Sequence, residues 1–162
     1  MNESGVQLES ELVVLCSIGT SHFGIPARRV QEIIRRPTVR VVHHTAFYVL
    51  GVFNLRGRIV ELLDPGKKLG LEEGPFPTDS RIMVLNSAET IVGILVHSVS
   101  GVFPFEASAV KPIPENLPAA QREMISGFLK IDEKIVAFLD VDALLKIPSA
   151  DKKLPVEQVL HR

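Results

Sequence analysis

The chain has 162 residues, a length that suits one domain or two small subdomains sharing one core. Its composition, 46% hydrophobic and 23% charged residues, is ordinary for a globular protein. The net charge of −1 argues against nucleic acid as the main partner, because phosphate binding usually requires a basic excess. No apolar run approaches the roughly 20 residues of a membrane span, and residues 1–5 do not resemble a signal peptide. A cytoplasmic location without direct membrane insertion is therefore expected.

Short apolar runs separated by turn residues fill most of the chain, after a polar lead-in over residues 1–10 that we expect to be flexible. After Pro26, the spacing of Val30, Ile33 and Ile34 predicts an amphipathic helix over 27–36. The remaining runs predict about ten strands, at 12–19, 22–26, 39–42, 48–55, 58–63, 82–85, 91–96, 99–105, 128–131 and 135–139.

One further helical turn and one further short helix are predicted. Residues 67–71 can form one helical turn, and a helix through Leu145 can take either Asp140 or Asp142 as its N-cap. Pro148 would end the second helix, because proline cannot continue one.

Proline, glycine and polar residues indicate where the folded segments begin and end. Residues 72–80, with two prolines and a glycine, are the best candidate for a junction between two subdomains. Residues 148–162 are polar and are interpreted as a peripheral tail, which leaves 11–147 as the folded unit. Many short strands with one or two short helices predict an all-β fold, and closed barrels would leave few exposed strand edges.

The segment Asn54-Leu55-Arg56-Gly57 stands between two of the predicted strands. A turn there needs the glycine, but it needs neither the asparagine nor the arginine. A guanidinium on a rigid two-strand support is well suited to binding a partner's carboxylate, because it forms paired hydrogen bonds. A solvated turn residue is the simpler alternative for Arg56.

Sequence motifs of catalysis or metal binding are not found, so no enzyme activity, cofactor or metal is expected. Cys16 lies in an apolar run and is interpreted as a small buried hydrophobic residue. His43 and His44 directly follow the predicted strand 39–42. Adjacent residues of an extended chain point to opposite faces, so this pair could not chelate one ion. His97 is interpreted as a satisfied or half-exposed histidine rather than a pH sensor.

Seven short segments occur along the chain in this order: Phe23-Gly24-Ile25-Pro26, Val30-Gln31-Glu32-Ile33, Gly51-Val52-Phe53-Asn54-Leu55-Arg56-Gly57, Leu62-Leu63-Asp64, Val92-Gly93-Ile94-Leu95-Val96, Val99-Ser100-Gly101-Val102 and Val136-Ala137-Phe138-Leu139-Asp140. Together they resemble the bacterial chemotaxis coupling protein family CheW over roughly residues 11–147. The resemblance implies two five-stranded SH3-like barrels on a shared core, and a non-catalytic adaptor. The chain differs from the usual family pattern at His43 and His97.

The implied partners are the regulatory domain of a CheA-type histidine kinase and the cytoplasmic tip of methyl-accepting chemoreceptors, in membrane-associated arrays. The implied partner-binding residues are Val30, Glu32, Asn54, Arg56, Gly57 and Arg81. The resemblance suggests that Arg56 pairs with Glu32, whereas helical spacing leaves Arg28, Arg35 and Arg36 as competitors.

Simpler alternatives stay open at two of these positions and for the chain as a whole. Val30 could pack in the core, and Arg81 could be a charged strand end facing water. The alternative function is a stand-alone β-barrel protein outside chemotaxis that binds a peptide or a small molecule.

Overall fold

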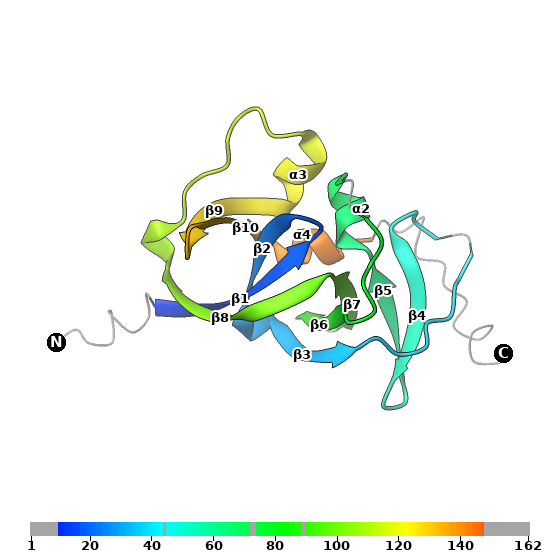
Figure 1. Cartoon of the computed structure of the whole chain (residues 1–162). Helices are drawn as coiled ribbons and strands as arrows, with labels where there is room; N and C mark the ends of the chain where they lie inside the picture. Colours follow the sequence, from blue (N-terminus) through cyan, green and yellow to red (C-terminus); the bar gives the residue numbers. More distant parts are fainter. Residues whose placement is uncertain (1–9, 44, 72–73, 89, 148–162) are drawn as a thin grey trace.

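The computed structural model describes residues 10–43, 45–71, 74–88 and 90–147. The predictions for residues 1–9, His44, Pro148 and the tail lie outside the described residues. Within the described part the chain forms two five-stranded sheets and a few short helices (Figure 1). The strands are β1 (Ser10–Ile18), β2 (Ser21–Pro26), β3 (Val30–Arg35), β4 (Val49–Leu55), β5 (Arg58–Leu63), β6 (Arg81–Ser87), β7 (Thr90–Val96), β8 (Ser98–Glu106), β9 (Ile125–Ile131) and β10 (Lys134–Leu139). The helices are α2 (Pro65–Leu69), α3 (Ala119–Met124) and α4 (Val141–Leu145), with 3₁₀ turns η1 (Ala27–Arg29) and η2 (Ala107–Ala109).

The two sheets are not consecutive halves of the chain. One sheet has the order β8-β1-β2-β10-β9, and the other has the order β3-β6-β7-β5-β4. Each contains one parallel pair, β10 with β2 and β5 with β7. Residues 72–80 therefore do not separate the barrels as predicted, because β6 and β7 that follow them pair with β3 and β5 that precede them.

Three apolar clusters show how the sheets become two barrels with a common core. One barrel interior is filled by Val13, Leu15, Leu129, Val136 and Phe138, and the other by Phe53, Leu55, Val60, Leu62, Ile82, Val84 and Leu95. The largest cluster lies between them and includes Val14, Cys16, Met83 and Leu85. Since neighbouring residues of a strand point to opposite faces, one strand supplies both a barrel interior and the shared core. The predicted pair of SH3-like barrels is confirmed.

The predicted helix over 27–36 is wrong. Residues 27–29 form η1 and the chain then continues as β3, which pairs antiparallel with β6. Burial along β3 alternates with a period of two, so Ile34 faces inward while Ile33 is 40% exposed. Three β-branched residues at helical spacing are also favourable strand residues, and the pairing with β6 decided between the two structures.

The predicted strand over 39–42 is also absent. Arg40 makes only an isolated two-bond bridge to Val52, with Arg40 N donating to Val52 O at 2.8 Å and Val52 N donating back at 2.9 Å. This bridge lies over Gly51, whose φ of 152° and lack of a side chain let the Arg40 carbonyl approach closely.

Two of the three short helices, α2 and α4, begin at aspartate caps. Asp140 Oδ1 accepts from the Ala143 N–H at 3.2 Å, which settles the open choice between Asp140 and Asp142. Asp64 caps α2 in the same way, so that helix begins two residues before the predicted turn at 67–71. Helix α3 was not predicted from the sequence.

Candidate functional site: the corner formed by Glu32 and Arg56

The hairpin of β4 and β5 ends in the two-residue turn Arg56-Gly57, because Leu55 pairs directly with Arg58. Both turn residues have left-handed backbone, with φ of 49° at Arg56 and 90° at Gly57, as hairpins with right-handed twist require. An arginine in this region is uncommon. Asn54 Oδ1 accepts a hydrogen bond from the Gly57 N–H at 2.8 Å and fixes the turn. The glycine and the asparagine therefore both have a structural reason.

The guanidinium of Arg56 binds the carboxylate of Glu32 through two parallel hydrogen bonds. Nη1 donates to Oε1 at 3.2 Å, and Nη2 donates to Oε2. The hydrogen bond from Arg56, followed by its positive charge, lowers the pKa of Glu32, and the same pairing raises the pKa of Arg56. Arg56 lies at the end of β4 and Glu32 on β3, which are the two outer strands of the sheet order. The pair thus connects the two ends of the sheet that closes into this barrel.

Two of the three local competitors for Glu32 have other partners. Arg28 pairs with Glu11 at 3.2 Å, and Arg36 donates to the hydroxyl of Ser80 at 3.4 Å. The pairing between turn arginine and Glu32 that the resemblance suggested is therefore present in the structure.

The two remaining predicted site residues lie apart from the turn. Val30 begins β3 and is half-buried against the shared core, which agrees with the simpler core interpretation. Arg81 begins β6 opposite Arg35, at the other end of the strand pairing from Val30. Its Nη1 donates to the backbone carbonyl of Asp79 at 2.5 Å. The structure therefore brings together Glu32, Asn54, Arg56 and Gly57 at one corner, but not Arg81.

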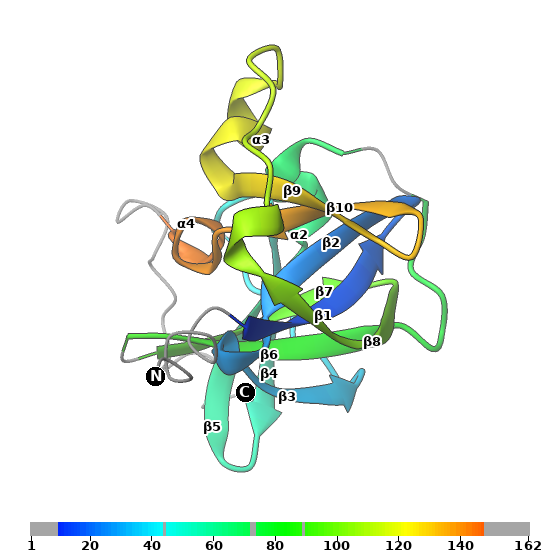
Figure 2. The same cartoon turned by 90° about the vertical axis from the view of Figure 1, so that its left-hand side faces the viewer.

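The corner offers directional charge recognition. The side chain of Arg56 is 67% exposed and that of Glu32 is 25% exposed, so the guanidinium faces solvent and its partner holds it in place. A guanidinium has five N–H donors, and the ion pair uses two of them. In Figure 1 and Figure 2 the tip of the β4–β5 hairpin and β3 lie at the end of the molecule opposite α3.

A second polar cluster was not found from the sequence. Arg29 of η1 donates from Nε to the Asn86 carbonyl at 3.1 Å and from Nη2 to Asp142 Oδ1 at 2.6 Å, while the Ser87 hydroxyl donates to the same oxygen at 2.9 Å. The hydrogen bond from Arg29 is the largest cause of the lowered pKa of Asp142. The cluster joins the connection between the sheets to β6 and α4. No local spacing could reveal it, because Arg29 and Asp142 are 113 positions apart.

Cys16 is buried and His97 is hydrogen-bonded and half-exposed, as predicted. Cys16 is fully buried, and burial raises the pKa of its thiol to about 12. The Nδ1 atom of His97 accepts from the Gly19 N–H at 3.0 Å, and its ring packs on Phe76 with centroids 4.3 Å apart. His97 lies in the bend between β7 and β8, and His43 is exposed.

Within residues 10–43, 45–71, 74–88 and 90–147, no three His, Cys, Asp or Glu side chains are grouped so that they could hold a metal ion. In that same part of the chain, every helix is too short to cross a membrane.

The two five-stranded sheets, each with its own apolar interior and one core between them, define the class of the fold: a double SH3-like domain. The profile of the CheW-like domain family matches residues 12–149, and the chain belongs to that family. A chemotaxis protein CheW from Klebsiella aerogenes is 30% identical over 132 residues, which cover 82% of this chain and 80% of the relative. A probable chemotaxis protein CheW from Rhizobium etli is 28% identical over 138 residues, covering 85% and 88%.

A solved structure gives independent support for the fold. The crystal structure of the scaffolding protein TtCheW from Thermoanaerobacter tengcongensis is similar with a TM-score of 0.79 at 22% identity, covering 89% of this chain and 98% of that one. Family membership makes the chain an adaptor of chemotaxis signal transduction, and the alternative of a stand-alone peptide or small-molecule binding barrel is not favoured.

Proposed function

We propose that this adaptor is non-catalytic and couples the cytoplasmic tip of chemoreceptors to the regulatory domain of a CheA-type histidine kinase. The observation that carries the site is the two-bond pair between Arg56 and Glu32 at an exposed hairpin tip. The pair sets the direction of the guanidinium before a partner arrives, so less side-chain freedom is lost on binding. The function is placed in residues 11–147, with 1–10 and 148–162 outside the adaptor unit.

The proposed docking corner consists of Glu32, Asn54, Arg56 and Gly57. Val30 and Arg81 are kept as proposed partner contacts on its flanks, since Val30 lies on the same strand as Glu32 and Arg81 on the adjacent strand β6. Each such contact would bury at most about 1,200 Å², which is the range of weak, exchangeable interfaces. A cytoplasmic array at the membrane would supply avidity by presenting many weak contacts at once.

Charge reversal tests the proposal directly. We expect Arg56→Glu to weaken binding of the purified kinase regulatory domain or receptor tip at least tenfold, because two carboxylates would then face each other at the corner. The double variant Glu32→Arg with Arg56→Glu should recover part of that loss. Affinities are measured by isothermal titration calorimetry, with circular dichroism to confirm that each variant is folded.

Lys130→Glu is a matched control. The side chain of Lys130 is also 67% exposed, and it also forms a surface ion pair, at 3.7 Å with Glu133. This variant makes the same change in net charge on the other sheet, so it should bind both partners normally. Full-strength binding of both partners by Arg56→Glu would show that the corner is not the docking site.

A further inference from the structure

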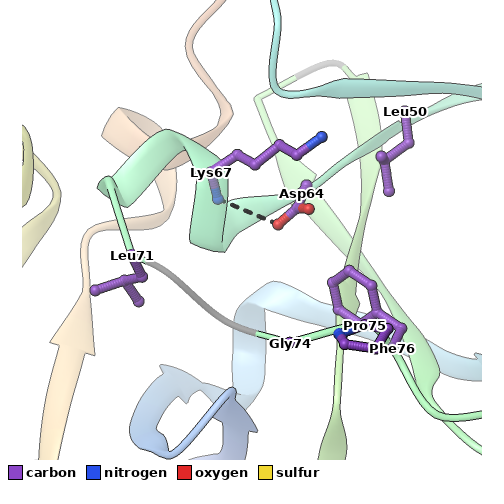
Figure 3. A pocket seen from close by; sticks show the side chains of 7 residues that line it. All are labelled: Leu50, Asp64, Lys67, Leu71, Gly74, Pro75 and Phe76. Atoms are coloured by element: carbon purple, nitrogen blue, oxygen red, sulfur yellow. Dashed lines mark hydrogen bonds between the residues drawn. The ribbon is translucent and has the colours of Figure 1, made fainter.

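A separate pocket of about 450 Å³ lies between β4, the beginning of α2, Leu71 and residues 74–76 (Figure 3). This volume is within the range of sites that hold small ligands or a single anchoring side chain. Its apolar walls come from Leu50, Leu71, Pro75 and Phe76. Of the described residues that line it, Asp64 is the acidic one and Lys67 is the basic one.

Asp64 is buried although it is an acid, with only 4% of its surface exposed. Its Oδ1 atom accepts from the Lys67 N–H at 3.2 Å. In the part of the chain that the structure describes, the other carboxylate oxygen has no hydrogen-bond partner, and none of the ion pairs includes Asp64. Figure 3 shows the carboxylate in the middle of the pocket, between Lys67 on one side and Phe76 on the other.

Capping of α2 does not by itself explain this burial. Asp140 caps α4 with the same geometry, an Oδ1 atom 3.2 Å from a backbone N–H, and it does so while exposed to solvent. A carboxylate in an apolar pocket loses hydration, and a positive charge beside it restores the lost stabilisation. The uncommitted oxygen of Asp64 is therefore a specific acceptor for a cation that enters between the apolar walls.

We propose that this pocket binds a guanidinium or ammonium group carried on an apolar stem, as found in an arginine or lysine side chain or in a free alkylguanidine. The cationic head would donate to the free oxygen of Asp64. The stem would pack on Leu50 and Leu71, and the ring of Phe76 offers a face for cation–π contact. The site is distinct from the corner of Glu32 and Arg56 and does not depend on the partners proposed there.

The binding test uses four probes on the isotopically labelled full chain, and binding is measured by amide chemical shifts in NMR. N-acetyl-arginine amide and its neutral isostere N-acetyl-citrulline amide differ only in charge at the head group. We expect saturable shifts at Leu50, Leu71 and Phe76 with the arginine probe, and at least tenfold weaker binding with citrulline. Equal binding of both probes, or no saturable shift with either, would overturn the proposal.

The third and fourth probes, agmatine and an alanine-flanked arginine peptide, distinguish a free small cation from an arginine side chain of a protein partner. Binding of agmatine with exclusion of the peptide identifies a free small cation, whereas peptide binding as tight or tighter identifies an arginine of a protein partner. Failure of both to bind overturns the proposal.

The variant Asp64→Asn removes the charge and keeps a side chain that caps helices well. We expect it to bind the arginine probe at least tenfold more weakly, while Asp140→Asn, the same change at the exposed cap, binds it normally. Unchanged binding by Asp64→Asn would refute the role of this carboxylate. The comparison of arginine with citrulline on the unmodified chain decides the question independently if Asp64→Asn does not fold.

Discussion

Substitution of Gly51 by alanine should destabilise the fold for a steric reason that can be read from the structure. A Cβ atom at this position would lie 2.3 Å from the Arg40 carbonyl oxygen and 2.9 Å from Val39 Cγ1. The clash is with a backbone carbonyl, so it cannot be relieved by rotation of a side chain. The segment that carries Arg40 would have to move away from β4. That movement breaks the two hydrogen bonds between Arg40 and Val52.

The cost has three parts. Each lost hydrogen bond is worth about 1 kcal/mol. A non-glycine residue in a sparsely populated backbone region costs on the order of 1–3 kcal/mol. Alanine lowers the entropy of the unfolded chain and returns roughly 0.4–1 kcal/mol. The net destabilisation of Gly51→Ala is therefore about 3 kcal/mol, by the sum of these terms.

Gly57→Ala is the matched control, because Gly57 also has a positive φ, of 90°, but no atom lies within 4 Å of an added Cβ. Backbone strain and the same entropy gain apply there, without a steric clash or a lost hydrogen bond, so we expect a net loss of about 1 kcal/mol. In thermal unfolding followed by circular dichroism, Tm should fall by roughly 6–12 °C for Gly51→Ala and 2–4 °C for Gly57→Ala. An equal or smaller effect at Gly51 would refute the steric argument.

Three further predictions concern buried or paired groups. Cys16 should not react with a thiol reagent at pH 8 in the native protein but should react fully in denaturant; rapid native labelling would contradict its burial. Burial lowers the pKa of Lys68 from 10.5 to about 8, so between these two pH values the unfolded chain binds more protons than the folded chain and stability should rise with pH. Lys68→Met should flatten this rise in Tm. Parallel plots of Tm against pH for the variant and the unmodified chain would refute the argument. Asp142 has a pKa below its ordinary 3.8 because of Arg29 and Ser87, so its stabilisation is present above pH 3.8 and is lost as pH falls through the lower folded value. Asp142→Asn should reduce this acid-dependent loss in urea titrations, and an unchanged pH profile would contradict the pairing.

The strands were predictable where a hydrophobic run is bounded by turn residues on both sides. The hairpin of β4 and β5 is the clearest case, since Asn54 and Gly57 indicate the turn that the structure contains. The segment 30–35 was not predictable in this way, because its β-branched residues satisfy a helical and an extended pattern equally. Its partner strand β6 begins about 50 residues later in the chain, and a local pattern holds no information about such pairing.

The candidate site was also predictable only in its local features. The turn at Arg56 follows from local residues, whereas its pairing with Glu32 was suggested by family resemblance and not by spacing. The contact of Arg29 with Asp142 depends on how η1 and α4 meet in space. Such contacts are set by the tertiary fold, so a single sequence cannot reveal them.

Residues 30–35 form a strand and not the predicted helix, and this explains why Glu32 pairs with Arg56. On a helix, Arg28 and Arg36 would have been direct neighbours of Glu32 and could have neutralised it. On an extended strand, a residue four positions away, such as Arg36, is roughly 13 Å distant, and Arg28 lies in η1 before the strand begins. These two arginines bind elsewhere, and Glu32 pairs with Arg56. β3 and β4 are the two outer strands of their sheet. The ion pair joins the β4–β5 turn to β3, and the bridge from Arg40 to Val52 joins β4 to the segment that follows β3. The direction of the exposed guanidinium is consequently determined by closure of the barrel and not by the hairpin alone.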